Sequence, residues 1–109
     1  MAKISDKAQP PIAPDAEEAL YAAILRLKNA DDCRRFLHDL CTPAELKALA
    51  ERWEIARLLQ AGNLSYREIR EQTGASTTTI SRVARFLNHE ANQGYRIVLA
   101  RTPNRKEKK

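Results

Sequence analysis

Residues 65–88 read SYREIREQTGASTTTISRVARFLN and hold the strongest local signal in the chain. They predict two short helices that meet at residues 73–76 (TGAS), because a tight turn needs one left-handed residue and glycine adopts that geometry without strain. Ile69, five residues before the glycine, and Ile80 and Val83, six and nine after it, are expected to pack the two helices together. This pattern indicates a helix-turn-helix.

The second of these helices has two distinct faces. Four apolar residues at the spacing of one helical face predict an inward stripe: Ile80, Val83, Ala84 and Leu87. The opposite side carries small hydroxyl side chains and arginines, namely Thr78, Ser81, Arg82 and Arg85. Small hydroxyls let a helix approach a duplex closely, arginine donates to phosphate and guanine edges, and the helix N-terminus offers free N–H groups. The pattern therefore favours DNA binding over an ordinary helical pair.

Two further helices are expected before this region. Asp15, with Glu18 three residues later, predicts a helix that runs to about Asn29. Either Asp31 or Asp32 is expected to cap a second helix. The apolar positions of that second helix are Phe36, Leu37, Leu40 and Cys41.

A long third helix follows. Residues 42–45 (TPAE) combine an N-cap, a first-turn proline and a capping-box glutamate, and Gly62 ends the helix. Trp53 lies on its apolar stripe and is expected in the core or at a dimer interface. The whole stripe comprises Leu46, Leu49, Ala50, Trp53, Ala56 and either Leu58 or Leu59.

The remaining helix boundaries follow from similar signals. Ser65 and Glu68 form a second capping box, and either Ser76 or Thr77 starts the helix that runs to about Asn88. Residues 95–100 are expected to be helical, because no segment of the chain alternates with period two to supply a partner strand. The fold class predicted is therefore all-α.

The length of 109 residues suits one domain. Residues 1–14, with three prolines, are expected to be a flexible arm, residues 15–100 the helical domain, and residues 101–109 a basic tail. A core this small is marginal alone, which favours an oligomer. The apolar run at residues 19–25 is too short to cross a bilayer, and no secretory signal is evident. We therefore expect a cytoplasmic protein and exclude both a membrane protein and a secreted disulfide scaffold.

Charge is distributed unevenly along the chain. The net charge is +5, yet acidic residues outnumber basic ones by seven to four over residues 15–45. The tail, residues 101–109, has five basic residues and one acidic residue. An acidic front and a basic back favour a polyanionic partner for the back half, while the tail by itself fits a solvated segment equally well.

No catalytic or metal site is predicted. Cys33 and Cys41, even with His38 between them, lack zinc-ligand spacing and are expected to be reduced thiols. Neither His38 nor His89 has a nucleophile at a recognisable spacing, and no glycine-rich phosphate loop is present. These observations argue against an enzyme, and no cofactor is expected.

Several short motifs occur together along the chain: Leu40-Cys41-Thr42-Pro43, Glu45, Ala48-Leu49, Arg52, Gly62, Ser65-x-Arg67-Glu68, Gly74-Ala75 and Thr79-Ile80-Ser81-Arg82. Together they resemble the Trp repressor family. The run at residues 74–85 (GASTTTISRVAR), with Gly94-Tyr95-Arg96 and Val98-Leu99, is more similar to the YerC/YecD branch of Trp-repressor-like proteins. The resemblance covers about residues 15–100 and is most specific over residues 40–88.

The resemblance implies an intertwined, all-helical homodimer in which two helix-turn-helix heads project from a shared core. The heads would contact two half-sites about 34 Å apart in a near-palindromic operator of double-stranded DNA. The implied function is sequence-specific regulation of transcription, as a repressor. DNA contacts carried over from the family fall at Tyr66, Arg67, Arg70, Thr77, Thr78 and Ser81. The exposed face described above adds Arg82 and Arg85.

The resemblance also points to a ligand site. The two arginines that hold tryptophan in the Trp repressor match Arg52 and Arg82, and Thr42 matches a residue near the ligand. However, Val83 and Phe86 stand where the family has a glycine and a serine, and they add bulk where the indole and amino group would lie.

Two hypotheses follow for this site. In one, Phe86 fills the ligand's place and the protein works without tryptophan. In the other, a different small-molecule effector binds near Arg52 and Arg82. A third reading gives the arginines no ligand role, with Arg82 on a phosphate and Arg52 paired with an acid. The acids considered are Glu45, Glu51 and Glu54.

Other functions fit parts of the pattern. A nucleic-acid-binding module with little sequence preference would use the same basic residues, and its binding would depend on salt without preferring a palindrome. An antitoxin-like interaction protein would contact DNA only within a complex. A small helical enzyme could hold a carboxylate with Arg52 and Arg82, but it would lack a base.

Overall fold

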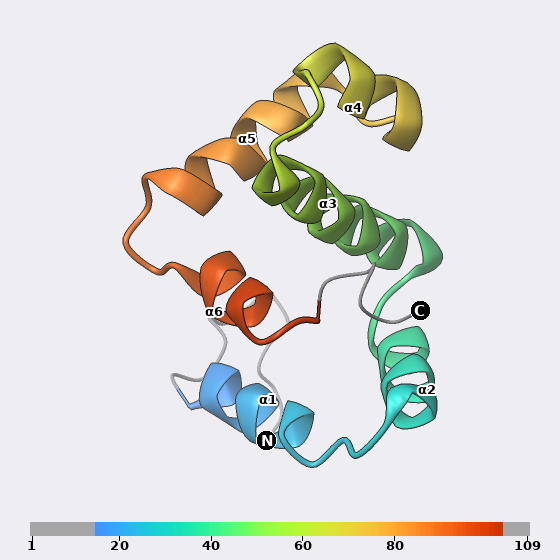
Figure 1. Ribbon diagram of the computed structural model, residues 1–109. Helices are drawn as coiled ribbons and strands as arrows, with labels where there is room; N and C mark the ends of the chain where they lie inside the picture. The colour runs from blue at the N-terminus through green and yellow to red at the C-terminus, as the bar shows by residue number, and fades with distance from the viewer. Residues whose placement is uncertain (1–14, 104–109) are drawn as a thin grey trace, which may run out of the picture. The chain divides into compact units, whose positions relative to one another are not determined.

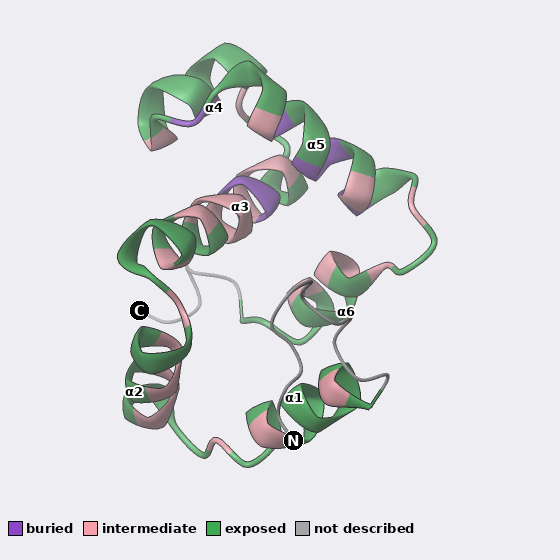
Figure 2. Ribbon diagram, turned by 180° about the vertical axis from the view of Figure 1, so that it is seen from behind, coloured by how far each residue is buried: buried purple, intermediate pink, exposed green. Residues whose placement is uncertain are grey.

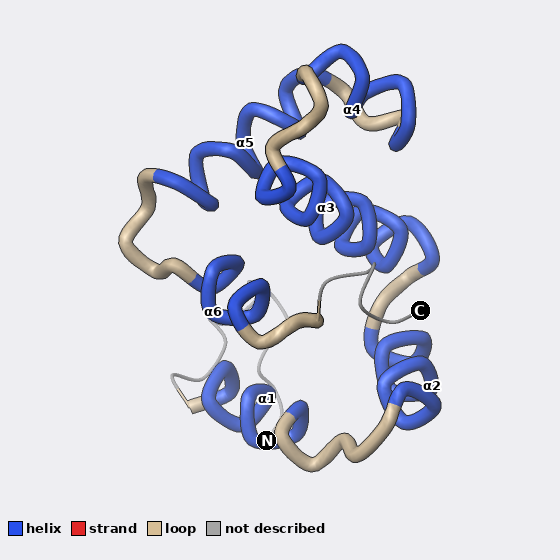
Figure 3. The backbone as a smooth tube through the Cα atoms, in the orientation of Figure 1, coloured by secondary structure: helices blue, strands red, loops and turns tan. Residues whose placement is uncertain are grey.

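Six α-helices follow one another along residues 15–103, the part of the chain that this computed structural model describes, and no strand occurs among them (Figure 1, Figure 3). They are α1 (Ala16–Ile24), α2 (Ala30–Leu40), α3 (Pro43–Ala61), α4 (Tyr66–Thr73), α5 (Thr77–Asn88) and α6 (Gly94–Ala100). The all-α prediction is confirmed. The arm predicted for residues 1–14 and residues 104–109 of the predicted tail lie outside the described part.

The chain divides into two units at the junction between Leu40 and Cys41. The first unit contains α1 and α2, and the second contains α3 to α6. Within the described residues, no helix combines the length and the apolar character needed to span a membrane.

Helix α1 is shorter than the sequence predicts. It ends at Ile24 rather than near Asn29, because the N–H groups of Arg26 and Leu27 bond three residues back and tighten the chain into a turn. The predicted side-chain cap is also wrong. Asp15 has helical backbone angles, φ −90° and ψ 0°, rather than the extended geometry of an N-cap that bonds the first turn.

Helix α2 begins one residue before the caps predicted for it. The Asn29 side chain accepts from the Asp32 N–H at 2.8 Å, so Asn29 caps the helix. Asp31 lies in the first turn and pairs with Arg34 at 2.6 Å and Arg35 at 2.8 Å. Asp31 and Asp32 therefore support the helix from inside its first turn, where acidic side chains favour the helix dipole.

The boundaries predicted for α3 and α4 are confirmed. Thr42 with Glu45 and Ser65 with Glu68 each form a reciprocal capping box. Gly62 and Gly74 end the two helices in the left-handed conformation, both at φ 77°. A residue with a Cβ atom is strained at this angle, so glycine fits both ends.

The core of the second unit lies where α3, α4 and α5 meet (Figure 2). All four residues of the inward stripe predicted for α5 are buried, and Ile69 of α4 is fully buried against them. The alanine of the turn, Ala75, is 3% exposed. The helix-turn-helix therefore closes its own core with the last turns of α3.

The apolar stripe predicted for α3 is only partly correct. Ala56 is buried and Trp53 packs against the core, but Leu49 remains 42% exposed. The sequence analysis missed Ile55, which is fully buried. The reason is that α4 and α5 pack on the second half of α3. Their contacts there determine which face of α3 is buried.

Helix α6 is confirmed as a helix and is tied to the ends of two others. One guanidinium nitrogen of Arg96 donates to Gln60 near the end of α3 at 3.1 Å, and the other donates to Asn88 at the end of α5 at 2.6 Å. Tyr95 packs against the core. These contacts hold α6 beside the helix-turn-helix.

Candidate nucleic-acid interface

Helix α5 presents the face that the sequence predicts. Its four buried residues point into the core, and every residue predicted to contact DNA from this helix is exposed. These exposed residues are Thr77, Thr78, Ser81, Arg82 and Arg85. Because the helix lies between a closed core and solvent, its outer face is free to meet a flat or grooved partner.

The start of α5 is suited to an anion. Ser76 caps the helix by accepting from the Thr79 N–H at 3.1 Å, and its Oγ lies 3.0 Å from that of Thr79. The N–H groups of Thr77 and Thr78 belong to the first turn, where a helix offers no internal acceptor. The helix dipole adds a partial positive charge there, which favours a phosphate oxygen.

Helix α4 contributes a second exposed set. Tyr66 is 45% exposed at the first position of the helix, and Arg67 and Arg70 are exposed farther along. Arg67 lies 3.8 Å from the Glu71 carboxylate, which is too long for a hydrogen bond. Arginines held this loosely on α4, the helix that precedes α5, can reach phosphates.

The arginines of α5 have partners in the helix and just after it. The Arg82 guanidinium lies 4.3 Å from the centre of the Phe86 ring, and that of Arg85 lies 5.1 Å from it. Arg85 also pairs with Glu90 at 3.2 Å. The sequence analysis did not single out Glu90, because it lies beyond the end of the helix and has no helical spacing to Arg85.

Two of the predicted ligand residues line one hollow of about 470 Å³ between α3, α5 and α6. They are Arg82 and Phe86. The other lining residues are Trp53, Asn92, Gln93, Gly94, Tyr95 and Val98. Thr42 caps α3, Arg52 is half-buried on α3, and Val83 is fully buried in the core, so these three do not line the hollow. The structure therefore brings together only part of the predicted set.

The acids considered as partners of Arg52 are engaged elsewhere among the described residues. Glu51 pairs with Lys47 at 2.9 Å, and Glu54 pairs with Arg57 at 2.6 Å. The third, Glu45, accepts from a backbone N–H in the capping box of α3. Among the described residues, no ion pair joins Arg52 to any of these three acids.

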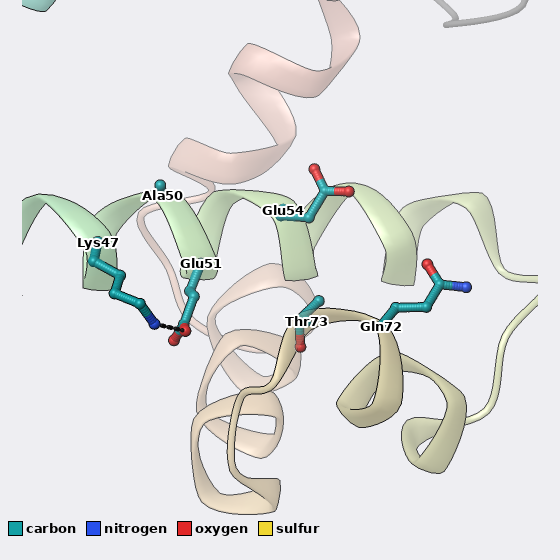
Figure 4. A pocket seen from close by; sticks show the side chains of 6 residues that line it. All are labelled: Lys47, Ala50, Glu51, Glu54, Gln72 and Thr73. Carbon is teal, nitrogen blue, oxygen red and sulfur yellow. Dashed lines mark hydrogen bonds and ion pairs between the residues drawn. The ribbon is translucent and has the colours of Figure 1, made fainter.

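A second hollow, of about 320 Å³, lies between α3 and the end of α4 (Figure 4). Figure 4 shows Lys47 and Glu51 joined along α3, with Gln72 and Thr73 approaching from α4. Both carboxylates of this hollow are already paired. Within residues 15–103, no three His, Cys, Asp or Glu side chains lie close enough together to hold a metal ion.

The architecture defines an all-α protein with a helix-turn-helix whose second helix exposes hydroxyls and arginines. Residues 16–103 match the family model described as Trp repressor protein, and the chain belongs to this family. Proteins of this family are DNA-binding regulators rather than enzymes.

Individual relatives agree with this assignment. Protein YerC of Bacillus subtilis, whose function is uncharacterised, is 49% identical over 84 residues, which cover 77% of this chain and 79% of YerC. A TrpR-like protein of Eubacterium eligens superposes with a TM-score of 0.75 at 45% identity, covering 82% of this chain and 90% of that one. A candidate Trp repressor of Staphylococcus aureus gives 0.74 at 41% identity, covering 79% and 84%. The predicted resemblance, including its YerC branch, is confirmed.

Proposed function

We propose that this chain is a homodimeric, sequence-specific DNA-binding regulator of transcription that represses from a near-palindromic operator and works without tryptophan. The observation that carries the proposal is the outer face of α5. It exposes Thr78, Ser81, Arg82 and Arg85, and no acidic residue lies within the helix. A face of small hydroxyls and arginines can enter a major groove and donate hydrogen bonds there, which a face of mixed charge cannot do as closely.

The exposed residues of α4 and α5 suit two different kinds of DNA contact, which supports specific recognition. Thr78 and Ser81 lie on the outer side of α5 and are short enough to bring the backbone near base edges. Arg67 and Arg70 lie on α4, where a phosphate contact would fix the head on the duplex.

Exposed apolar side chains support the homodimer. Helices α1, α2 and α6 contain no buried residue, and large apolar side chains on them remain exposed. Leu25, directly after the end of α1, is 85% exposed, while Leu40 on α2 and Val98 on α6 are each 51% exposed. An apolar helix face is stable in water only when another surface covers it, and a second copy of the chain would supply that surface.

The contact between Arg82 and Phe86 supports independence from tryptophan. A guanidinium that already lies over an aromatic ring at 4.3 Å has less to gain from stacking on an indole. Calorimetric titration with tryptophan should show no binding in the micromolar range. A micromolar dissociation constant would contradict this part of the proposal.

In vitro selection tests the main proposal. The purified protein is incubated with random-sequence duplex DNA without added ligand, and the bound duplexes are amplified and sequenced. We expect an enriched near-palindrome with half-sites about one helical turn apart. Salt-dependent binding without an enriched sequence would instead favour a non-specific nucleic-acid-binding module, and no binding at all would favour an antitoxin-like interaction protein.

Two variants separate the roles of the helices. Thr78→Gln should alter the selected sequence, because a longer side chain changes what reaches the base edges. Arg70→Ala should weaken binding to all sequences and reduce the slope of log affinity against log salt by about 0.9 for one lost phosphate contact. If both variants bind like the wild type, α4 and α5 are not the DNA-binding surface.

A further inference from the structure

The segment that follows α5 folds back on Arg85. The N–H of Glu90 donates to the Arg85 carbonyl at 3.2 Å, and the Arg85 Nε lies 3.2 Å from Glu90 Oε2. The Gln93 side chain donates to the Glu90 carbonyl at 2.7 Å. Main-chain and side-chain contacts together therefore hold Glu90 beside Arg85. The position of its carboxylate is set by these contacts as well as by the attraction between the two charges.

This ion pair contributes little to the stability of the fold. The side chain of Arg85 is 59% exposed and that of Glu90 is 40% exposed. Pairs this exposed add little to folding, because water and salt screen them. The carboxylate nevertheless occupies the Nε edge of the guanidinium, and this edge is one that a phosphate would use. The Phe86 ring approaches the same guanidinium at 5.1 Å, which further restricts Arg85.

We propose that the Glu90 carboxylate competes with DNA phosphate for the Arg85 guanidinium. In the free protein the carboxylate stands where a phosphate would bind, so a duplex must displace it before Arg85 can contribute. This inference rests on the proposed function. Because phosphate contacts supply nearly all of non-specific affinity, such a competitor lowers binding to DNA of any sequence and leaves the geometry of the recognition helix unchanged.

The other ion pair of the head provides a matched control. Arg67 and Glu71 are separated by 3.8 Å, and their side chains are 80% and 66% exposed. Glu71→Gln changes the net charge of the head by the same amount as Glu90→Gln. It releases no arginine from a close contact, so it measures the general effect of removing one negative charge.

The test is a set of binding titrations on the full chain. Glu90→Gln and Glu71→Gln are each made in the wild-type chain and in an Arg85→Ala background. Affinity for a random-sequence duplex is measured by fluorescence anisotropy over a series of salt concentrations. Glutamine at position 90 keeps the backbone contact to Arg85, and thermal unfolding followed by circular dichroism confirms that each variant folds. Glu90→Ala serves as a second variant and should reproduce the result.

We expect Glu90→Gln to raise affinity about two- to fivefold, the range that an exposed ion pair can supply. The salt dependence should steepen by at most about 0.9, the value for one phosphate contact, and by less the more fully the duplex displaces Glu90 in the wild-type chain. Glu71→Gln should change affinity by less than about twofold. In the Arg85→Ala background, Glu90→Gln should have no effect, because the residue through which it acts has been removed.

Three results would overturn the inference. They are an unchanged affinity in Glu90→Gln, an equal gain in Glu71→Gln, or a gain that persists in the Arg85→Ala background, which would reflect general repulsion. A wild-type chain that binds no duplex would overturn the proposed function, and the inference with it. A wild-type chain that binds in a salt-dependent way, without the coupling to Arg85, would overturn the inference alone.

Discussion

The two units of the chain differ in how they bury apolar side chains. Over residues 15–40 no side chain is buried, whereas residues 41–103 contain every buried residue of the described chain. The buried residues belong to α3, α4, α5 and the turn before α5. The helix-turn-helix therefore completes a core with α3, while α1 and α2, like α6, contain no buried residue and leave large apolar side chains exposed. The predictions below test this contrast.

Truncation in the core of the head should have the largest effect on stability. Ile80 is fully buried among residues of α3, α4 and α5. Ile80→Ala should lower the free energy of unfolding by about 2–5 kcal/mol, through lost apolar burial and the cavity left behind. Urea unfolding at one fixed protein concentration measures this loss. The exposed Gln72→Ala should stay within about 0.5 kcal/mol; a similar loss in both variants would refute the placement of the core.

A charge on an exposed apolar face should break the proposed dimer without unfolding the head. Val98 on α6 is 51% exposed in one chain. Val98→Asp should weaken dimerisation by roughly a hundredfold, because the carboxylate would be buried without a partner. Analytical ultracentrifugation measures the dissociation constant. Ala91→Asp, in the exposed connection before α6, is the control. Unchanged dimerisation in Val98→Asp would show that this face is not covered by a second copy.

The turn of the head should be sensitive to backbone strain alone. A Cβ atom added at Gly74 would meet nothing within 4 Å, yet the residue has φ 77°. Gly74→Val should therefore cost about 1–3 kcal/mol, because a β-branched residue resists a positive φ. Gly94 has equal space and no positive φ. Gly94→Ala should be neutral or slightly stabilising. Thermal unfolding measures the stability of both variants, and equal losses at both positions would exclude strain as the cause.

The smallest effect is expected at the connection between α6 and the head. Arg96→Met removes the hydrogen bonds to Gln60 and Asn88 while it keeps most of the side chain's volume. Stability should fall by about 1–2 kcal/mol, since each bond is worth about 1 kcal/mol net. Chemical unfolding measures the change. Arg101→Met, an exposed position just after α6, should be neutral; a neutral Arg96→Met would mean that α6 is held by apolar contacts alone.

Sequence reasoning succeeded where the relevant contacts are local. The capping boxes at Thr42 and Ser65 and the left-handed residues at Gly62 and Gly74 each involve groups within five residues of one another. It failed at α1, whose end no local signal marks. The turn after Ile24 is closed by backbone hydrogen bonds that many residue types can make. It also assigned the α2 cap to Asp31 or Asp32, although Asn29 is as good a capping residue and lies two residues before the first of them.

In the candidate site, too, the sequence predicted the local features and missed the contacts between helices. The outer and inner faces of α5 follow from helical periodicity, because a side chain's direction is fixed once the helix forms. Helical periodicity does not, however, predict which of the expected ligand residues come together in space. Val83 was considered for the ligand site, yet its position on the inward stripe places it in the core, and Thr42 is engaged in capping α3.

The sequence by itself determined the helix boundaries from α3 to α5, the turn at Gly74 and the exposed face of α5, since each depends on interactions along a few residues. Only the tertiary structure decided that Ile55 is buried on α3, that Arg96 reaches Gln60 from 36 residues away, and that Glu90 returns to Arg85. The first two features depend on how helices pack in three dimensions, and residues distant in the sequence carry no periodic signal of their meeting. The third depends on the path of the backbone after α5, which helical periodicity does not describe.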